Sequence, residues 1–525
     1  MRLSFVLASF SVAMLACVGD GDTTQDSGAN DAQVDNSQPV DSGVDAKETS
    51  APTYTIGGTV HFLQASGGDA GTGLVLANGS DKVTVTQAGT FAFPVKASSY
   101  DVTIATNPPG QVCSVRNATG KGTATADVTT IVIGCTIAMQ STGATTQFTM
   151  SSKTAVPIAN LSNIAFSTDV ASKALVSLMM PSIGMPTSSF DDVVTAIQLD
   201  GTDVTGGNWG NQNNIGQGAH TIYGIIDVPA GTHTLSATWH TMFNFGANTA
   251  TAYAGYPAQL DIVVLDSLSV FTTTAHGNGT ASQNNSSSTP SSLMTDVAFT
   301  TSAPSPVLAL MQAPQISVNS NAQTNLAKSS FTLSADSTVL STAQVNGYTQ
   351  DAAVLLVGLS TLGTGTHSLK ASWADPTTAF TVASKIAPRM DAIVLSPTAH
   401  VASSTTSSNQ TTSQSTFSSV PGLSPLALTA STATKALLIM HTDASAGGSD
   451  KYAGGELTVA LDNQAIAGGV TAITSSIALG AYPVTFIQLV DVAAGSHTFQ
   501  AQFRATNLDL NTGAGTSGIM AILIE

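Results

Sequence analysis

The stretch Val228–Trp239 (VPAGTHTLSATW) decides how this chain folds, because two close relatives of it lie further along the sequence. These are Leu362–Trp373 (LGTGTHSLKASW) and Val492–Phe503 (VAAGSHTFQAQF). The shared glycines Gly231, Gly365 and Gly495 are 134 and 130 residues apart. Self-similarity at a nearly fixed period is the mark of a repeated structural unit.

Apolar stretches recur in the same order around each copy. Each copy ends in an apolar strand: Leu260–Leu265, Met390–Leu395 and Ile519–Ile524. A middle strand recurs at Ala196–Leu199, Ser330–Leu333 and Leu457–Leu461, and upstream strands recur at Ala174–Met180, Val307–Met311 and Ala436–Met440. The Gly-Thr/Ser-His turn, followed by alternating apolar residues, predicts a hairpin with one buried face. The sequence therefore predicts three tandem all-β domains.

Each copy resembles the jelly-roll domains of the tumour-necrosis-factor and complement globular-head type, and those of related phage-fibre heads. A tandem of immunoglobulin-like sandwiches is the alternative, although these domains are shorter. Because jelly rolls of that type assemble as trimers, the resemblance implies that the three copies close into a single-chain pseudo-trimer. The other arrangement is a string of separate domains. The connectors, residues 272–292 and 402–419, are polar and are expected to be flexible, with a reach of roughly 25 Å.

Residues 53–136 precede the copies and form a different unit. Short strands about ten residues apart, with turn signals at Asn78-Gly79 and Ala88-Gly89, predict a small β-sandwich. This stretch resembles a module that is common in large bacterial surface proteins, which implies a structural, spacer-like or adhesive role. Cys113 and Cys135 are predicted to form a disulfide; a metal site is the rival, but two thiols without a nearby histidine hold metal poorly.

The N-terminus is typical of an exported protein. Arg2 is followed by the apolar run Leu3–Ala16 and then Cys17, and this run is too short to span a bilayer. Met14-Leu15-Ala16-Cys17 resembles the lipobox of bacterial lipoproteins, which implies that Cys17 becomes lipidated; an ordinary signal peptide is the alternative. Residues 18–52 are polar and acidic, and we expect a disordered tether such as those of Gram-negative surface lipoproteins. The predicted organisation is a signal peptide (1–17), tether (18–52), β-sandwich module (53–136) and three jelly-roll-like repeats (137–266, 267–397 and 398–525).

Charge and motifs narrow the possible functions. The formal net charge is -17 and only 15 basic residues are present, so a nucleic-acid partner is not expected. No nucleophile elbow, zinc-binding helix, phosphate loop or dinucleotide fingerprint is present. We therefore expect no catalytic residues, no cofactor and no metal. Asp191-Asp192 is a paired carboxylate, but adjacent residues on a strand point to opposite faces, so we expect a solvated turn.

The repeated histidines His233, His367 and His497 are the obvious site candidates. A threefold metal site on the pseudo-axis is one interpretation, and a histidine that hydrogen-bonds its own turn is the other. The second is favoured because no acidic residue or second histidine is expected to recur beside them: Asp227 and Asp491 precede the turn in two copies, but Thr361 takes that place in the other.

Two of the three tryptophans, Trp239 and Trp373, follow the buried alternation and are expected in the core. Trp209 lies in a polar stretch that we expect to be a loop, either as a ligand-contact residue or as a loop anchor.

These observations together predict a non-enzymatic, monomeric lipoprotein at the cell surface, anchored to the membrane by Cys17 and most consistent with the outer membrane. Its β-domains would serve adhesion or structural contact with other proteins. A glycan-binding surface lipoprotein is the alternative, with Trp209 in the binding loop.

Overall fold

The computed structural model describes most of the chain beyond residue 51. The described residues are 52–64, 73–116, 119–185, 191–211, 218–242, 249–281, 283–319, 328–346, 352–374, 381–384, 386–446, 453–475, 482–506, 510–512 and 515–524. Pro52–Glu525 forms one compact unit. The predicted lipidation site Cys17, the signal peptide and the tether up to residue 51 lie outside the described residues.

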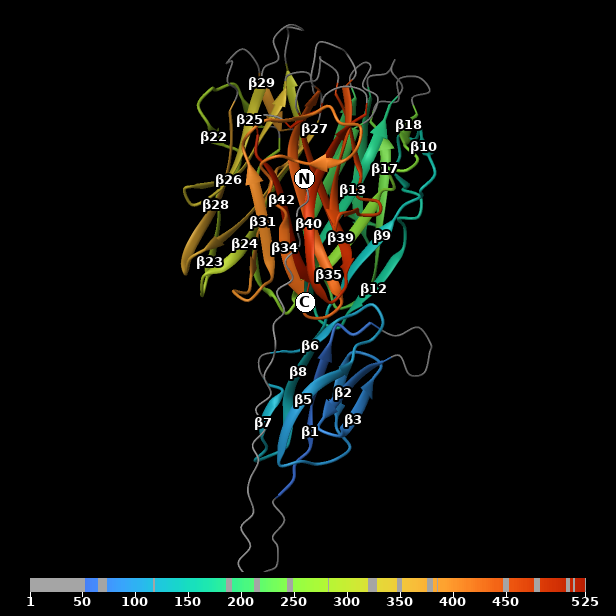
Figure 1. The fold of residues 1–525 in the computed structure, drawn as a ribbon, viewed down its shortest axis with the longest axis vertical. Helices are drawn as coiled ribbons and strands as arrows, with labels where there is room; N and C mark the ends of the chain where they lie inside the picture. Colours follow the sequence, from blue (N-terminus) through green and yellow to red (C-terminus); the bar gives the residue numbers. More distant parts are fainter. Residues whose placement is uncertain are drawn as a thin grey trace, which may run out of the picture. The chain divides into compact units, whose positions relative to one another are not determined.

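The fold is all-β, as predicted (Figure 1). Within the described ranges the single helical element is the 3-10 turn η1 (Leu265–Ser267). No helix among these residues has the length and apolar character needed to cross a bilayer.

Residues 54–135 form a two-sheet sandwich, the N-terminal module. One sheet has the order β4-β1-β8-β6 and the other β3-β2-β5-β7. The strands are β1 (Ile56–His61), β2 (Leu74–Asn78), β3 (Asp81–Val85), β4 (Gly89–Ala92), β5 (Ser99–Thr106), β6 (Cys113–Arg116), β7 (Lys121–Thr123) and β8 (Val128–Cys135). The predicted Cys113–Cys135 disulfide is present and joins β6 to β8.

Each repeat is a sandwich of an inner and an outer sheet. In repeat 1 the inner sheet has the order β9-β19-β13-β16 and the outer sheet has β17 between β12 and β14, followed by β15. The strands are β9 (Ala138–Thr142), β10 (Phe148–Met150), β11 (Val156–Pro157), β12 (Ile164–Thr168), β13 (Ser172–Gly184), β14 (Asp191–Leu199), β15 (Thr202–Asn211), β16 (Gly218–Val228), β17 (Gly231–Thr241), β18 (Ala250–Ala252) and β19 (Gln259–Val264). This double-sheet order is of the jelly-roll class.

Repeats 2 and 3 have the same strand order. Repeat 2 comprises β20 (Phe271–Asn278), β21 (Gln283–Asn285), β22 (Ser291–Ser292), β23 (Val297–Thr301), β24 (Ser305–Asn319), β25 (Lys328–Ala335), β26 (Thr338–Asn346), β27 (Ala352–Leu362), β28 (Gly365–Ala374), β29 (Thr381–Ser384) and β30 (Arg389–Leu395). Repeat 3 comprises β31 (Val401–Thr406), β32 (Gln410–Thr412), β33 (Ser418–Ser419), β34 (Leu426–Ala430), β35 (Thr434–Ala446), β36 (Ala453–Leu461), β37 (Gln464–Ala465), β38 (Thr471–Ser475), β39 (Tyr482–Val492), β40 (Gly495–Ala505), β41 (Leu510–Thr512) and β42 (Ser517–Ile524). The predicted closing strands are β19, β30 and β42.

The predicted hairpin at the Gly-Thr/Ser-His turn is wrong. β16 pairs with β13 in the inner sheet, whereas β17 pairs with β12 and β14 in the outer sheet. The turn therefore carries the chain from one sheet to the other. Gly231 has φ +145°, a region that L side chains rarely adopt, and Gly365 and Gly495 share this conformation. The alternating apolar residues of β17 correctly indicated that this strand has one buried face. Alternation does not indicate which other strand it pairs with.

The connectors predicted to be flexible contain strands instead. β20 covers residues 271–278 and β31 covers residues 401–406, and both pair with the closing strand of their own repeat. Their polar composition misled the prediction because each strand lies at an edge of its inner sheet, where many of its side chains are exposed or half-buried.

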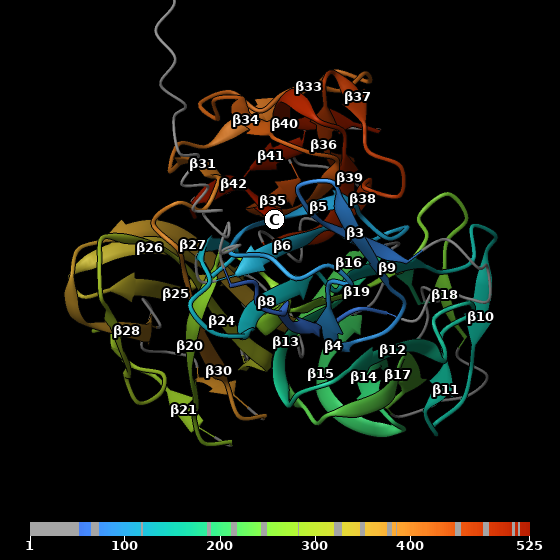
Figure 2. The ribbon, with the colours of Figure 1, turned by 90° about the horizontal axis from the view of Figure 1, so that it is seen from below.

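The three inner sheets share one apolar core. Figure 2 shows the three repeats, in green, yellow and orange to red, arranged around a common centre. One buried cluster, which we call the axial core, draws on all three repeats. Its members include Leu175, Tyr223 and Val263 of repeat 1, Leu310, Val357 and Ile393 of repeat 2, and Ile439, Ile487 and Ile522 of repeat 3. Each sandwich also has its own core.

Candidate functional site: the histidine clamps and the seams between repeats

Each repeated histidine is held between a carboxylate and a backbone carbonyl. His233 Nδ1 lies 2.8 Å from Asp200 Oδ2, and its Nε2 lies 2.8 Å from the carbonyl oxygen of Pro229. The same arrangement occurs for His367 with Asp336 and Gly363 (2.9 and 2.8 Å), and for His497 with Asp462 and Ala493 (2.7 and 2.9 Å). We call these three arrangements the histidine clamps.

The chemistry of a clamp follows from its two acceptors. A carboxylate and a carbonyl both accept, so only the imidazolium form, with a proton on each nitrogen, satisfies both partners. The hydrogen bond that His367 donates to Asp336 raises the pKa of His367, and the one that His497 donates to Asp462 raises the pKa of His497. The hydrogen bonds in return lower the pKa of all three aspartates, Asp200, Asp336 and Asp462.

The aspartates also fix the local backbone. Asp200 Oδ1 accepts the N–H of Thr234 at 2.7 Å, and the other two aspartates make the equivalent bond. Each aspartate has a positive φ, between 51° and 53°, in the turn that follows the middle strand. A short polar side chain that bonds locally is among the few that tolerate this conformation. The clamp thus ties that turn to the sheet crossing.

The expectation that no acidic residue recurs beside the histidines is therefore wrong. The carboxylates recur in space, 33, 31 and 35 residues before their histidines, and not next to them in the sequence. Asp227 and Asp491, which precede the turn, instead pair with Lys173 and Lys435 at 2.6 and 2.5 Å. The signal available in the sequence was an aspartate followed by Gly, Ser or Asn after each middle strand, at Asp200, Asp336 and Asp462.

A clamp is poorly suited to acid–base catalysis. In repeat 2 the Thr301 hydroxyl lies 3.1 Å from His367 Nε2, which gives a Thr-His-Asp order. The Thr301 hydroxyl, however, donates to the carbonyl of Gly363, and His367 Nε2 donates to the same carbonyl. A general base needs a free lone pair at that nitrogen. Repeat 3 carries Ala430 in the register of Thr301, so the hydroxyl is not a shared feature.

The clamps also do not form the threefold metal site considered from the sequence. Each histidine lies on an outer-sheet strand and is bonded within its own repeat, whereas the axis is lined by the inner sheets. Among the described residues, no group of three or more His, Cys, Asp or Glu side chains is placed to hold a metal ion.

The remaining sequence candidates, the three tryptophans and the paired aspartates, all lie in strands. Trp239 and Trp373 are buried core residues, as predicted. Trp209 lies in strand β15, opposite Ala352 of β27, and not in a loop; its side chain lies outside the described residues. Asp191 and Asp192 start strand β14 and do not form a solvated turn; Asp192 is buried.

The seams between repeats are built on the edge strands β16, β27 and β39, whose outer backbone groups would otherwise be unpaired. At the seam between repeats 1 and 2, Arg389 donates to the carbonyl of Ile225 at 3.0 Å, and Gln312 Oε1 accepts the N–H of Tyr223 at 3.1 Å. The Tyr223 hydroxyl donates to Asp391 at 2.9 Å. This seam is therefore bonded by side chains of both repeats, and β15 of repeat 1 also pairs with β27 of repeat 2.

The seam between repeats 3 and 1 is also formed on an edge strand, β39, but its contacts come from other residues. The N–H of Leu489 donates to Asp261 Oδ2 at 3.2 Å, and Gln140 donates to the carbonyl of Leu489 at 2.8 Å. Gln259 donates to the carbonyl of Gly468 at 2.7 Å. Leu489 and Ile225 have the same register in their edge strands.

The seam between repeats 2 and 3 has a third set of contacts. The Thr485 hydroxyl donates to the carbonyl of Leu355 at 3.0 Å, and the N–H of Gln344 donates to Asp443 at 2.8 Å. The register that holds Asp261 in repeat 1 and Asp391 in repeat 2 holds Met520 in repeat 3. The three seams thus share a backbone plan and differ in chemistry.

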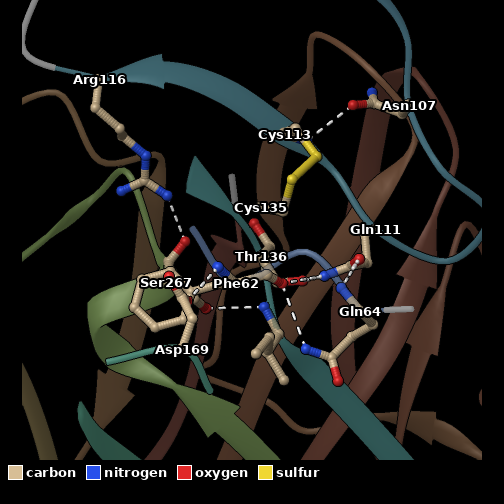
Figure 3. Close-up of a disulfide and its surroundings, with 11 residues drawn as sticks. Phe62, Gln64, Asn107, Gln111, Cys113, Arg116, Cys135, Thr136, Asp169 and Ser267 are labelled. Atoms are coloured by element: carbon tan, nitrogen blue, oxygen red, sulfur yellow. Dashed lines mark hydrogen bonds between the residues drawn. A yellow bond between two sulfur atoms is a disulfide. The ribbon is translucent and has the colours of Figure 1, made fainter. Parts of the chain in front are cut away.

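The N-terminal module is bonded to repeat 1 beside the disulfide (Figure 3). Asp169 accepts the N–H of Phe62 at 2.8 Å and pairs with the ring of His61 at 2.6 Å. Gln64 donates to the carbonyl of Ser167 at 2.7 Å, and Arg116 donates to the carbonyl of Ser267. These bonds involve side chains of both partners, so the module is fixed to repeat 1 by specific contacts.

Comparison with known proteins adds little. No protein-family profile matches the chain, and no curated protein matches it. Among solved structures, PNGF-II in space group C2 is 10% identical, with 64% of this chain and 98% of that chain covered and a TM-score of 0.22. PNGF-II in space group P21 is 9% identical, with 64% and 99% covered and a TM-score of 0.22. The plant peptide RALF23 in complex with FER and LLG2 is 8% identical, with 48% and 89% covered and a TM-score of 0.16. Likenesses of this size carry no argument about function.

Proposed function

We propose that this chain is a lipid-anchored surface protein that presents a rigid three-repeat head for adhesion or structural contact with other proteins, without catalysis. The anchor is Cys17, at the end of the apolar N-terminal run, and the acidic segment 18–52 holds the head away from the membrane. The resemblance of Met14–Cys17 to a lipobox and the polar tether behind it support outer-membrane attachment and display at the cell surface.

The observation that carries the proposal is the axial core. Three jelly-roll-class sandwiches, each with its own core, also bury apolar side chains against one another. Such a head keeps three equivalent outer surfaces at fixed mutual angles, which suits multivalent contact with a partner. The polar side chains that recur most regularly, those of the histidine clamps, are used internally and leave no free acid or base.

The anchor is tested by cell fractionation of the wild type and the Cys17→Ala variant, with incorporation of labelled fatty acid as the direct readout. We expect label and membrane association in the wild type and neither in the variant. Label in the variant, or its absence from the wild type, contradicts lipidation at Cys17.

The binding role is tested with the head, residues 52–525, immobilised and offered to extracellular-matrix proteins and to a glycan array. Saturable protein binding that is lost when the head is unfolded supports the proposal. Binding confined to glycans would replace it with a glycan-binding role, and turnover of any glycan would contradict the non-enzymatic assignment.

A further inference from the structure

Asp261 is a buried acid at the seam between repeats 3 and 1. It lies on β19, with a residue exposure of 2%, and faces the edge strand β39. Its Oδ2 accepts the N–H of Leu489, whereas its Oδ1 is buried without a hydrogen-bond partner. A buried carboxylate oxygen without a donor is costly when charged.

No cation contacts this carboxyl group among the described residues. The neighbouring strand β9 contributes the amide of Gln140 and no charged group. On β13, Lys173 is engaged by Asp227 at 2.6 Å.

The charged groups on the repeat 3 side have partners of their own. The buried Glu456 of β36 is bonded to Arg504 at 2.7 Å and accepts the hydroxyl of Tyr256 across the same seam at 2.5 Å. Lys435 of β35 forms an ion pair with Asp491 of β39 at 2.5 Å. It acts on Asp261 only as a more distant positive charge, which slightly opposes the rise in the pKa of Asp261.

Burial also raises the pKa of the equivalent acid Asp391, and its Oδ1 likewise has no hydrogen-bond partner. Asp391 differs from Asp261 because Arg389 lies 3.3 Å from its Oδ2 and the Tyr223 hydroxyl donates to it.

The consequence is a protonated acid in the closed seam. Burial raises the pKa of Asp261 to about 8, against smaller opposing effects from the Leu489 N–H, Gln140 and Lys435. An aspartate in water titrates near 3.9. Opening this seam to water therefore releases a proton at any pH between these two values.

We propose that the seam between repeats 3 and 1 is a pH-dependent latch, tightest in acid and progressively easier to open as the pH rises toward 8. This seam joins repeats that are not consecutive in the chain, so no connector holds it shut. Because opening releases one proton, the ratio of open to closed seam rises by up to about tenfold per pH unit between about 4 and 8. Above 8 both forms are ionised and the ratio levels off. The device is independent of the proposed adhesive function.

The Leu489 amide is the natural reporter, since its N–H donates to Asp261. We would measure hydrogen exchange of the full chain by mass spectrometry at pH 5, 6, 7 and 8, corrected for the intrinsic exchange rate. Protection of the segment spanning β39 should fall at least tenfold from pH 5 to 8. Segments spanning β27 are the internal control, because Met520 takes the register of Asp261 at that seam. That seam also holds the buried Asp443, which accepts the Gln344 N–H, so β27 should lack the Asp261 contribution and change less than β39.

Two variants of Asp261, with one of Asp391 as the control, decide the cause. Asp261→Asn keeps the shape of the side chain but cannot ionise, so protection of β39 should become independent of pH. Asp261→Met introduces the residue that repeat 3 has in this register, Met520, and protection of β39 in this variant should also be independent of pH. Asp391→Asn should keep the wild-type slope at β39. A flat wild-type profile, an equal slope at β27, or a slope that persists in both Asp261 variants would overturn the proposal; if neither variant folds, the comparison of β39 with β27 in the wild type decides.

Discussion

Replacement of Ile439 by alanine tests whether the three repeats fold as one unit. Ile439 lies on β35 of repeat 3, is fully buried, and belongs to the axial core. The substitution removes three carbons, which corresponds to about 2.4 kcal/mol of transfer free energy at about 0.8 kcal/mol per carbon. A rigid site adds a cavity cost, so we expect the free energy of unfolding to fall by about 3–4 kcal/mol.

The distribution of the three tryptophans provides a fluorescence assay for this variant. Trp239 and Trp373 report on repeats 1 and 2, and Trp209 also lies in repeat 1, whereas repeat 3 has Phe503 in the equivalent position and no tryptophan. Tryptophan fluorescence during urea unfolding therefore sees only the two repeats that the substitution leaves unchanged. A shared core predicts that this fluorescence transition shifts to lower urea, together with the circular-dichroism transition.

The matched control is Val339→Ala in repeat 2, a valine with 57% of its surface exposed, which should change stability by less than about 0.5 kcal/mol. The reasoning is refuted if Ile439→Ala leaves the tryptophan transition unmoved while circular dichroism shows a separate early phase. That outcome would mean that repeat 3 unfolds alone and that the axial core does not couple the repeats.

Three further outcomes are expected. Cys135→Ser should lower the unfolding free energy of the N-terminal module by about 3 kcal/mol, because the disulfide closes a loop with a sequence separation of 22; reductant should reproduce the effect in the wild type and leave the variant unchanged. Tyr223→Phe should cost about 1–3 kcal/mol in urea unfolding, since the buried Asp391 loses a donor, and no change would show that the bond is not made. Asp462→Asn should lower the pKa of His497 in an imidazole NMR titration; in the wild type the stability from this clamp is present below about pH 6.5 and is lost as pH rises through the raised pKa of His497.

The three repeats and their closing strands could be predicted from the sequence. The similar segments recur about 130 residues apart, and a strand buried on both faces is visible as a local apolar run. The apolar runs Leu260–Leu265 and Ile519–Ile524 become β19 and β42, which are buried on both faces between their own sandwich and the axial core. A strand with two buried faces shows no alternation, and its continuous apolar run is the signal. The disulfide could be predicted for a similar reason, since only two cysteines remain after Cys17.

Pairing partners could not be read in the same way. The stretch around Gly231 shows alternation, but whether β16 and β17 form a hairpin or cross between sheets depends on contacts with β13 and β14, far away in the sequence. The clamp carboxylates escaped notice for the same reason. Asp200 meets His233 only after the turn that follows β14 has folded next to the sheet crossing.

The divergence of the seams follows from having three repeats in one chain. In a homotrimer, symmetry makes every seam identical, so one residue at a given position must serve all three. Covalent linkage removes that requirement, and the shared register of Asp261, Asp391 and Met520 shows the result: an acid bonded to a backbone amide, an acid with an arginine and a tyrosine, and an apolar residue. Asp391 depends on a side chain of one edge strand, because the register that holds Tyr223 in β16 holds Val357 in β27 and Ile487 in β39. Either of the other edge strands in this seam would leave the buried Asp391 without its hydroxyl donor, which costs more than the lost bond. The Tyr223–Asp391 contact thus favours β16 over the other two edge strands at its seam, while the axial core is common to all three repeats.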